Sequence, residues 1–240
     1  MKKMNDKISK NIYKFSRFCI RCFSSRYRVC LSEKNINDTG IPVVYVVHHQ
    51  NLRGPILSIA WLNIPVHLWV LSVFSDQRTC FRQFYDYTFT QRRGIPKGLA
   101  AVIAYPVSVW VSGIMQGMNA IPVFRGSRAI AKTFNQSLKA LINGENLLIC
   151  PDIDYTDPGP HMGEMYDGFL DLERYYIKRT GHHLAFIPLY ISKREHCIYE
   201  GKAVYFHTVG DFKNEKKNVY DRLMQEFSRL ENRYGSGLMS

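Results

Sequence analysis

Three groups of polar side chains that can do chemistry each follow a short apolar run of the sequence. They are His48 and His49 after residues 41–47, Arg125 and Arg128 after residues 120–124, and Asp152 and Asp154 after residues 147–150. An imidazole exchanges protons near neutral pH, a guanidinium binds anions, and a carboxylate can orient a histidine ring. If they meet, these groups predict an acid–base site that holds an anionic substrate.

The apolar runs are typical of strands in a mostly parallel sheet, because they are continuous rather than alternating. We also expect strands at 184–191 and 203–206 and a turn at 36–40. Apolar residues spaced by three or four predict helices within 130–142, 165–176 and 219–230. The sequence therefore predicts an α/β fold with a central, mostly parallel sheet flanked by helices. Ligands of such sheets lie outside the carboxyl ends of the strands, where the polar groups fall.

Arg125 and Arg128 come just before a helix that we expect to begin near Ala129. A helix N-terminus beside a guanidinium suits a phosphate group. The same spacing is also typical of two solvated surface arginines, so the residues alone leave both interpretations open.

Composition places the chain among globular proteins with a basic N-terminus. The 240 residues are 46% hydrophobic and 22% charged, which excludes wholesale disorder. The net charge of the chain is +12. Residues 1–34 contain ten basic and two acidic side chains, so they supply +8 of this charge. Apolar residues recur there at helical spacing between Ile8 and Cys22. This pattern predicts a basic amphipathic arm (1–34) for an anionic membrane surface, followed by one α/β domain (35–240).

Two alternatives for the arm stay open. It can be a solvated tail, or its interleaved basic and aromatic residues can bind nucleic acid. Nothing else in the chain matches a nucleic-acid module, so we expect no nucleic-acid partner.

Two long stretches, 54–75 and 98–124, are free of charge and long enough to cross a bilayer. Pro65 and Pro106 interrupt them, and the connector 76–97 is basic, which opposes two clean spans. We expect buried or half-inserted helices and a location at the cytoplasmic face of the cell membrane.

The six cysteines predict thiols in a reducing compartment, because no secretory signal is visible. Cys19 and Cys22 lack a second ligand pair at zinc-finger spacing. His161 lies in the loop of Asp154 and Asp157, but that loop has no EF-hand pattern. We therefore expect neither a metal nor a cofactor.

Four segments resemble, in order, the conserved blocks of the glycerolipid (lysophospholipid) acyltransferases. Residues 48–55, His-His-Gln-Asn-Leu-Arg-Gly-Pro, are similar to the first block, His-x4-Asp. Residues 117–126 resemble the second block, 144–152 the third, and 185–189 the fourth. The resemblance covers roughly residues 40–210.

This resemblance implies a membrane-associated enzyme of phospholipid biosynthesis with a glycerol-3-phosphate acyltransferase-like fold. An acyl group would pass from acyl-CoA or acyl carrier protein to the hydroxyl of a lysophospholipid or a glycerol-phosphate-type acceptor. His48 would be the general base, and Asp152 would stand where the family's third-block Glu helps to bind the acceptor. The other substrate-binding positions would be Asn51, Arg53, Arg125, Gly126, Arg128 and Pro151.

Position 53 departs from the family pattern, because Arg replaces the Asp that orients the histidine. One explanation is that Asp154 or Asp157 takes over this role. The other is a weak or inactive acyltransferase-fold protein that binds anionic lipid. A shifted register would make His49 the base but would place Gly54 at the acid position, so we favour His48.

Overall fold

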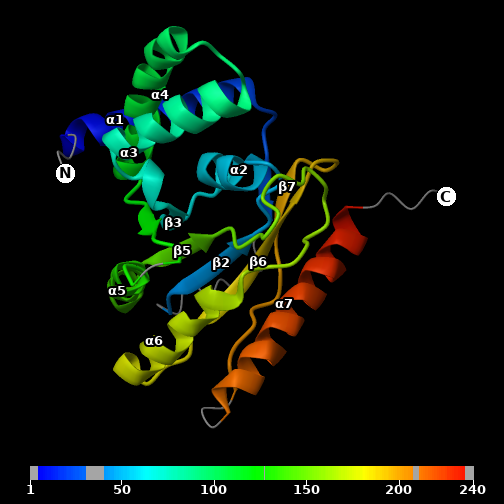
Figure 1. Ribbon diagram of the computed structural model, residues 1–240. Coiled ribbons are helices and arrows are strands. Elements are labelled where there is room, and N and C mark those ends of the chain that lie inside the picture. The colour runs from blue at the N-terminus through cyan, green and yellow to red at the C-terminus, as the bar shows by residue number, and fades with distance from the viewer. Residues whose placement is uncertain (1–4, 31–40, 127, 208–210, 236–240) are drawn as a thin grey trace. The chain divides into compact units, whose positions relative to one another are not determined.

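The computed structural model describes residues 5–30, 41–126, 128–207 and 211–235, and it forms two compact units (Figure 1). The first unit holds the described residues of 1–19 and 67–136, and the second holds those of 20–66 and 137–240. The turn predicted at 36–40 lies outside the described residues.

The second unit is built on a five-stranded sheet in the order β1-β7-β6-β2-β5. All neighbouring pairs in it are parallel except β6 with β7. The strands are β1 (Arg28–Cys30), β2 (Val43–Val47), β5 (Asn146–Ile149), β6 (Ala185–Ser192) and β7 (Cys197–Glu200). The predicted α/β fold with a mostly parallel sheet is therefore confirmed.

Strand β2 lies at the centre of this sheet, between β6 and β5. Every residue of β2 is buried, as expected for a strand covered on both faces. Because β6, β2 and β5 run parallel, their carboxyl ends share one edge of the sheet. The residues that follow them are Lys193, His48 and Cys150.

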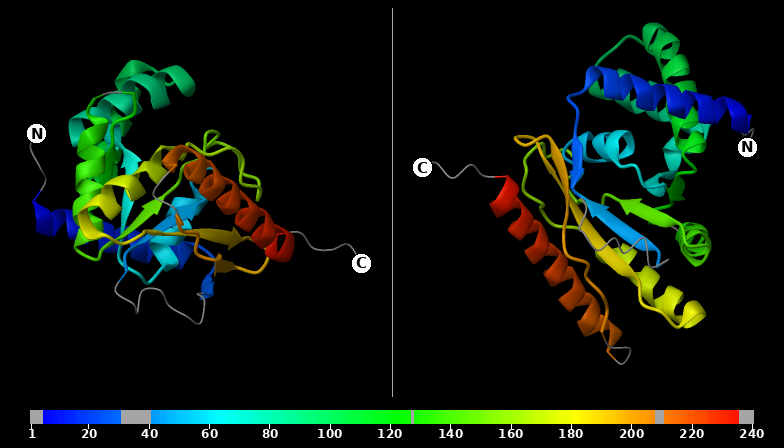
Figure 2. Two further views of the ribbon diagram at one scale, coloured as in Figure 1. Left: turned by 90° about the horizontal axis from the view of Figure 1, so that it is seen from below. Right: turned by 180° about the vertical axis from the view of Figure 1, so that it is seen from behind.

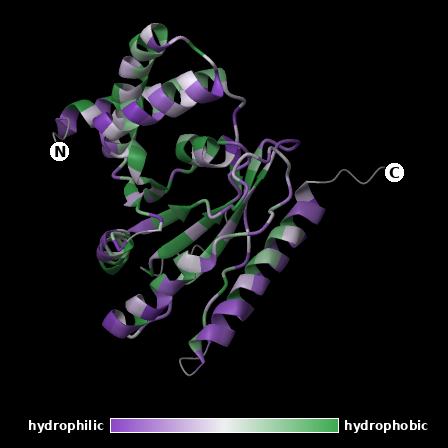
Figure 3. Cartoon of the chain, in the orientation of Figure 1, coloured by the Kyte–Doolittle hydropathy of each residue, from purple (hydrophilic) through white to green (hydrophobic). Residues whose placement is uncertain are grey.

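Helices of the second unit pack against the sheet. Helix α7 (Phe212–Tyr234) packs along β6 and turns Val219, Leu223 and Phe227 inward, while its outer face is hydrophilic (Figures 1 and 3). Asp211 caps this helix by accepting a hydrogen bond from the backbone N–H of Asn214. The remaining elements are α2 (Arg53–Trp61), the 3-10 helix η4 (Asp167–Asp171) and α6 (Leu172–Thr180).

The first unit is mainly helical. Its two short strands, β3 (Val66–Leu71) and β4 (Ile121–Val123), pair in parallel. Its helices are η2 (Ser72–Phe74), α3 (Gln77–Arg82), the π-helix η3 (Gln83–Arg92) and α4 (Lys97–Gly117). Helix α1 (Asp6–Phe23) begins in this unit, and α5 (Ile130–Ile142) links it to the second unit. Figure 2 shows both units from two further sides.

Helix α4 is the one described helix that is long and apolar enough to cross a membrane. Only 28% of its most apolar window is buried, and Leu99, Val102, Tyr105 and Trp110 are exposed. Helix α1 packs against it where Gly117 leaves room for the backbone carbonyl of Ser9, and Phe15 meets the edge of the Trp110 ring.

Three predictions need correction. The stretch 54–75 is not one helix but α2, β3 and η2, because Asn63 and Pro65 end the helical conformation after Trp61. The strand predicted at 203–206 is reduced to a single bridge between Val204 and Phe186.

The antiparallel partner of β6 is instead β7, which sequence analysis missed. It follows β6 through a tight turn that has His196 at φ 46°. The third correction concerns the thiols, because Cys30 and Cys197, on adjacent strands β1 and β7, form a disulfide.

Candidate active site

His48 is held by an unusual turn that directly follows β2. Gln50, Asn51 and Leu52 all have positive φ, a conformation that is costly for residues other than glycine. The turn is closed by a hydrogen bond of 3.0 Å from the Gly54 N–H to the His49 carbonyl. Such local strain persists only where the surroundings enforce it, which is typical of functional sites.

Gly54 is required for this turn by close packing. A Cβ atom at position 54 would overlap the carbonyl oxygen of His48 and crowd the side chain of Val47. The start of α2 therefore presses directly on the backbone that carries the imidazole. The close approach to the His48 carbonyl explains why position 54 is a glycine.

Asp152 is positioned at the end of β5 by the returning loop. It forms an antiparallel bridge with Met165, and the Tyr166 N–H donates to the Pro151 carbonyl at 2.8 Å. The Met165 N–H donates to the Tyr220 hydroxyl of α7 at 3.0 Å, which ties the loop to that helix. Asp152 thus stands on a braced segment rather than on a free loop.

The His48 ring and the Asp152 carboxylate form a buried pair. The Nδ1–H of His48 donates to Oδ1 of Asp152, and Oδ2 accepts the His49 backbone N–H at 3.0 Å. Each of the two residues is only 4% exposed. Since a carboxylate can only accept, this contact places the ring proton on Nδ1 and leaves a lone pair on Nε2.

The Nε2 atom of His48 is buried and has no hydrogen-bond partner within the described parts of the chain. Buried polar atoms are normally paired, so an orphan of this kind calls for an explanation. A substrate hydroxyl that arrives at this atom would satisfy it. The arrangement can therefore act as a general base with an oriented ring.

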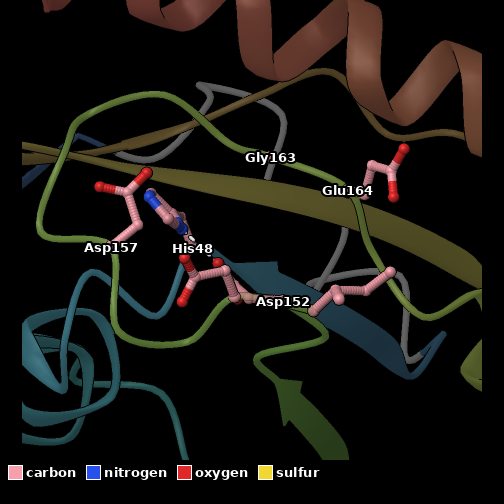
Figure 4. Close-up of a pocket in the computed structure, with 7 residues that line it drawn as sticks. His48, Asp152, Asp157, Gly163 and Glu164 are labelled. Atoms are coloured by element: carbon pink, nitrogen blue, oxygen red, sulfur yellow. Dashed lines mark hydrogen bonds and ion pairs between the residues drawn. The ribbon is translucent and has the colours of Figure 1, made fainter.

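A cavity of about 230 Å³ opens beside this pair (Figure 4). It is lined by His48, Asp152, Ile153, Asp154, Asp157, Gly163 and Glu164. Asp154 accepts the N–H and the hydroxyl of Thr156, and these bonds hold the pKa of Asp154 below its ordinary value. Asp157 accepts the Gly159 N–H at 2.7 Å. The contact with the His48 ring is thus made by Asp152, while Asp154 and Asp157 stabilise their own turns.

The other predicted residues fall into two groups. Asn51 and Arg53 are exposed in the turn after β2, and Pro151 is buried beside Asp152. Arg125, Gly126 and Arg128 are exposed in the turn after β4, in the first unit, with Gly126 at φ 68°. The structure thus unites His48, Asp152 and Asp154 around one pocket.

Lys193, which sequence analysis missed, lies near Arg53. Its pKa is lowered by burial and by the Arg53 charge, while Asp157 opposes the shift. Its ammonium also donates to the Pro158 carbonyl at 2.5 Å. The sequence could have indicated Lys193 as a site residue by its position directly after β6, because β6 ends at the same sheet edge as β2. Glu164 had no comparable signal, since the chain brings it to the pocket only by folding back.

No group of three His, Cys, Asp or Glu side chains among the described residues is arranged to hold a metal ion. His161, in the same loop as Asp154 and Asp157, donates from Nδ1 to Glu231 of α7 at 2.9 Å.

Comparison with solved structures finds similar folds. No protein-family model and no curated protein match the sequence. The fold is similar to the crystal structure of the 1-acyl-sn-glycerophosphate (LPA) acyltransferase PlsC from Thermotoga maritima, with a TM-score of 0.50 and 14% sequence identity. The match covers 96% of this chain and 83% of that one. At this identity the likeness establishes a shared fold.

Proposed function

We propose that this chain is a membrane-associated O-acyltransferase that uses His48 as its general base. The acyl donor is a thioester, acyl-CoA or acyl carrier protein, and the acceptor is the hydroxyl of a lysophospholipid or a glycerol-phosphate-type lipid. The fold shared with an LPA acyltransferase supports this reaction class.

One observation carries the proposal, namely the buried pair of His48 and Asp152, in which Nε2 has no partner among the described residues and His48 lines a cavity. The family pattern places the orienting carboxylate at position 53, where this chain has Arg53. Asp152 makes the equivalent contact from the neighbouring strand end. The departure at position 53 therefore does not deprive the ring of a carboxylate.

The reaction follows from these groups. Nε2 of His48 takes the proton of the acceptor hydroxyl as its oxygen attacks the thioester carbonyl. Asp152 stabilises the imidazolium that forms. The carbon–sulfur bond then breaks, the imidazolium returns the proton to the departing thiolate, and the products are an ester and a free thiol. General acid–base catalysis of this kind contributes about 10²–10⁴-fold in rate.

The negative charge of the substrate is proposed to bind to arginines that are not part of the His48–Asp152 pair. Arg125, with Gly126 and Arg128, is the proposed site for a phosphate of the substrate, since it occupies the second-block position and precedes α5. Asn51 and Pro151 shape the approach to His48, and Arg53 adds a cation beside the turn. These roles remain proposals.

Membrane attachment is the proposed role of α1 and of the exposed apolar residues of α4. Phe15, Phe18 and Phe23 are more than half exposed on a helix that also carries five basic side chains, Lys7, Lys10, Lys14, Arg17 and Arg21. Such a helix binds anionic lipid surfaces. It would keep the enzyme on the bilayer that contains its acceptor.

A second candidate function is a weak or inactive acyltransferase fold that binds anionic lipid. Arg53 favours it, because its guanidinium has no hydrogen-bond or ion-pair partner within the described residues and a family carboxylate is missing there. The pairing of His48 with Asp152 favours the active enzyme.

The deciding experiment is incubation of the full chain in lipid vesicles with radiolabelled acyl donors and a panel of lysolipids, beside His48→Ala. The active enzyme forms labelled diacyl product that the variant does not form. No product with any acceptor from folded protein would overturn the proposal and leave the lipid-binding function.

A further inference from the structure

The wall of the pocket beside His48 is acidic. Asp154, Asp157 and Glu164 all line it, in addition to the Asp152 that is engaged by the ring. In Figure 4 the His48 ring lies between the carboxyl groups of Asp152 and Asp157, with Glu164 on the returning strand of the loop. The cavity lining includes no lysine or arginine.

These carboxylates are poorly neutralised. Asp154 and Glu164 have no ion-pair partner within the residues that the structure describes. Lys193 lies close enough to Asp157 for the two charges to interact, so the negative charge of Asp157 is partly offset, and the Lys193 ammonium also donates to the Pro158 carbonyl. Asp154 and Glu164 thus add two negative charges to the lining residues that no ion pair in the described parts of the chain offsets.

A second, independent feature points to a ligand in this cavity. His48 lines the pocket and is only 4% exposed, and its Nε2 has no hydrogen-bond partner among the described residues. The acidic wall and the unsatisfied base thus face the same space. A ligand that fits both would present a hydroxyl to Nε2 and positive charge to the wall.

The size of the cavity selects among cations. A volume of about 230 Å³ equals several water molecules at about 30 Å³ each, which is too roomy for a single bare ion. The carboxylates also do not converge as a metal-ligand set within the described residues. The same volume is smaller than the 300–1,000 Å³ of sites that enclose a whole drug-sized ligand. It suits a headgroup whose acyl chain stays outside.

We propose that this pocket receives the ammonium group of an amine-bearing lysolipid acceptor, with Asp154, Asp157 and Glu164 as its counter-charges. This inference rests on the proposed acyl transfer and narrows its acceptor class. A phosphate monoester, with up to two negative charges, would be repelled by the same wall. A phosphodiester that carries an ammonium has one negative charge fewer than a fully ionised monoester and presents a cation to the acidic wall.

The test compares two acceptors with the same short acyl chain below its micelle concentration, lysophosphatidylcholine and lysophosphatidic acid. Binding to the full chain is measured by calorimetry, and acyl transfer is measured separately with labelled acyl-CoA. We expect the choline-bearing lipid to bind at least tenfold more tightly.

Variants identify the wall as the cause of this preference. Asp154→Asn/Glu164→Gln should reduce it at least fivefold, and Asp154→Lys/Glu164→Lys should invert it. Both residues are exposed, so these changes leave the core intact. Asp221→Asn, an exposed site on α7, is the matched control and should change nothing.

The outcomes separate the two proposals. Equal or tighter binding of lysophosphatidic acid, or a preference that the variants leave unchanged, overturns the ammonium site. A wall-dependent preference without acyl transfer supports the ammonium site and contradicts the proposed enzyme activity. Transfer to lysophosphatidic acid alone supports the enzyme and overturns the narrower acceptor class.

Discussion

His48 and Asp152 are 104 residues apart in the sequence, and their side chains form a hydrogen-bonded pair with almost no exposure to solvent. The two residues follow neighbouring parallel strands, β2 and β5, so the sheet itself sets their separation. The second carboxylate oxygen of Asp152 is bound to the His49 N–H, which fixes the direction of the first. The pair is thus oriented from both sides.

Asp152→Asn should lower kcat by about 10²–10⁴-fold. The amide can donate to Nδ1 and so favour the wrong ring tautomer, and it cannot stabilise an imidazolium. Acceptor KM should change little, because the substitution alters the ring rather than the cavity volume. The measurement is steady-state acyl transfer, with Asp221→Asn as a control for the loss of a carboxyl group. A variant within threefold of wild type would contradict the proposed role.

Gly54→Ala should impair both folding and activity. The added methyl group overlaps the His48 carbonyl, so the turn must shift at a cost of about 1–3 kcal/mol. Thermal unfolding should report a lower Tm, and acyl transfer should fall because the imidazole moves. Gly168→Ala is the matched control, since a Cβ there meets no atom within 4 Å. An equally stable and active Gly54→Ala variant would show that the turn adapts freely.

Much of the second unit could be predicted from local pattern. The buried strand β2 is readable in its continuous Val-rich run, and α7 in the spacing of Val219, Leu223, Phe227 and Leu230. Strand β7 could not be predicted in this way. Its four residues, Cys197–Glu200, are too few to show a period, and β6 defines them as a strand by pairing with them.

The candidate site was predicted only in part for a similar reason. His48 is visible because it ends an apolar run and begins a recognisable motif. The partner of its ring depends on which of several loop carboxylates the fold brings back to β2, and spacing does not encode this choice. Two contacts determine which carboxylate reaches the ring. They are the bridge between Asp152 and Met165 and the hydrogen bond from the Met165 N–H to the Tyr220 hydroxyl.

Arg53→Asp should not raise the activity. Asp152 already occupies the Nδ1 side of His48, so a new carboxylate at position 53 has no vacant place on the ring. We expect acyl transfer equal to or below that of wild type. Arg53→Ala serves as the control that separates loss of the guanidinium from gain of the carboxylate. A severalfold increase with Arg53→Asp alone would indicate a damaged site and favour the non-catalytic function.

Cys80 and Cys150 should resist alkylation in the native protein. Burial raises the pKa of Cys80 to about 12 and that of Cys150 well above its ordinary value. At pH 8 a thiol of pKa 12 is about 10⁻⁴ thiolate, against about a quarter for an ordinary free cysteine of pKa 8.5. Peptide mapping after maleimide treatment should find label at the exposed Cys22 and, at Cys80 and Cys150, only after denaturation. Rapid native labelling of Cys150 would contradict its raised pKa.

Ile8→Ser/Phe18→Ser should weaken binding to anionic vesicles by about 100-fold. Both side chains are at least half exposed, so the substitutions remove apolar surface without opening the core. Full transfer of one such side chain is worth about 1.5–3 kcal/mol, and since only about half of each is exposed, the two together contribute about 1.5–3 kcal/mol, of which the upper part, about 2.7 kcal/mol, is about 100-fold in affinity. Tyr175→Ser on α6 is the control at an equally exposed aromatic site. Co-sedimentation at low and high salt separates this apolar contribution from the attraction of the basic residues, because salt screens only the charges. Unchanged binding at both salt concentrations would place membrane attachment elsewhere in the chain.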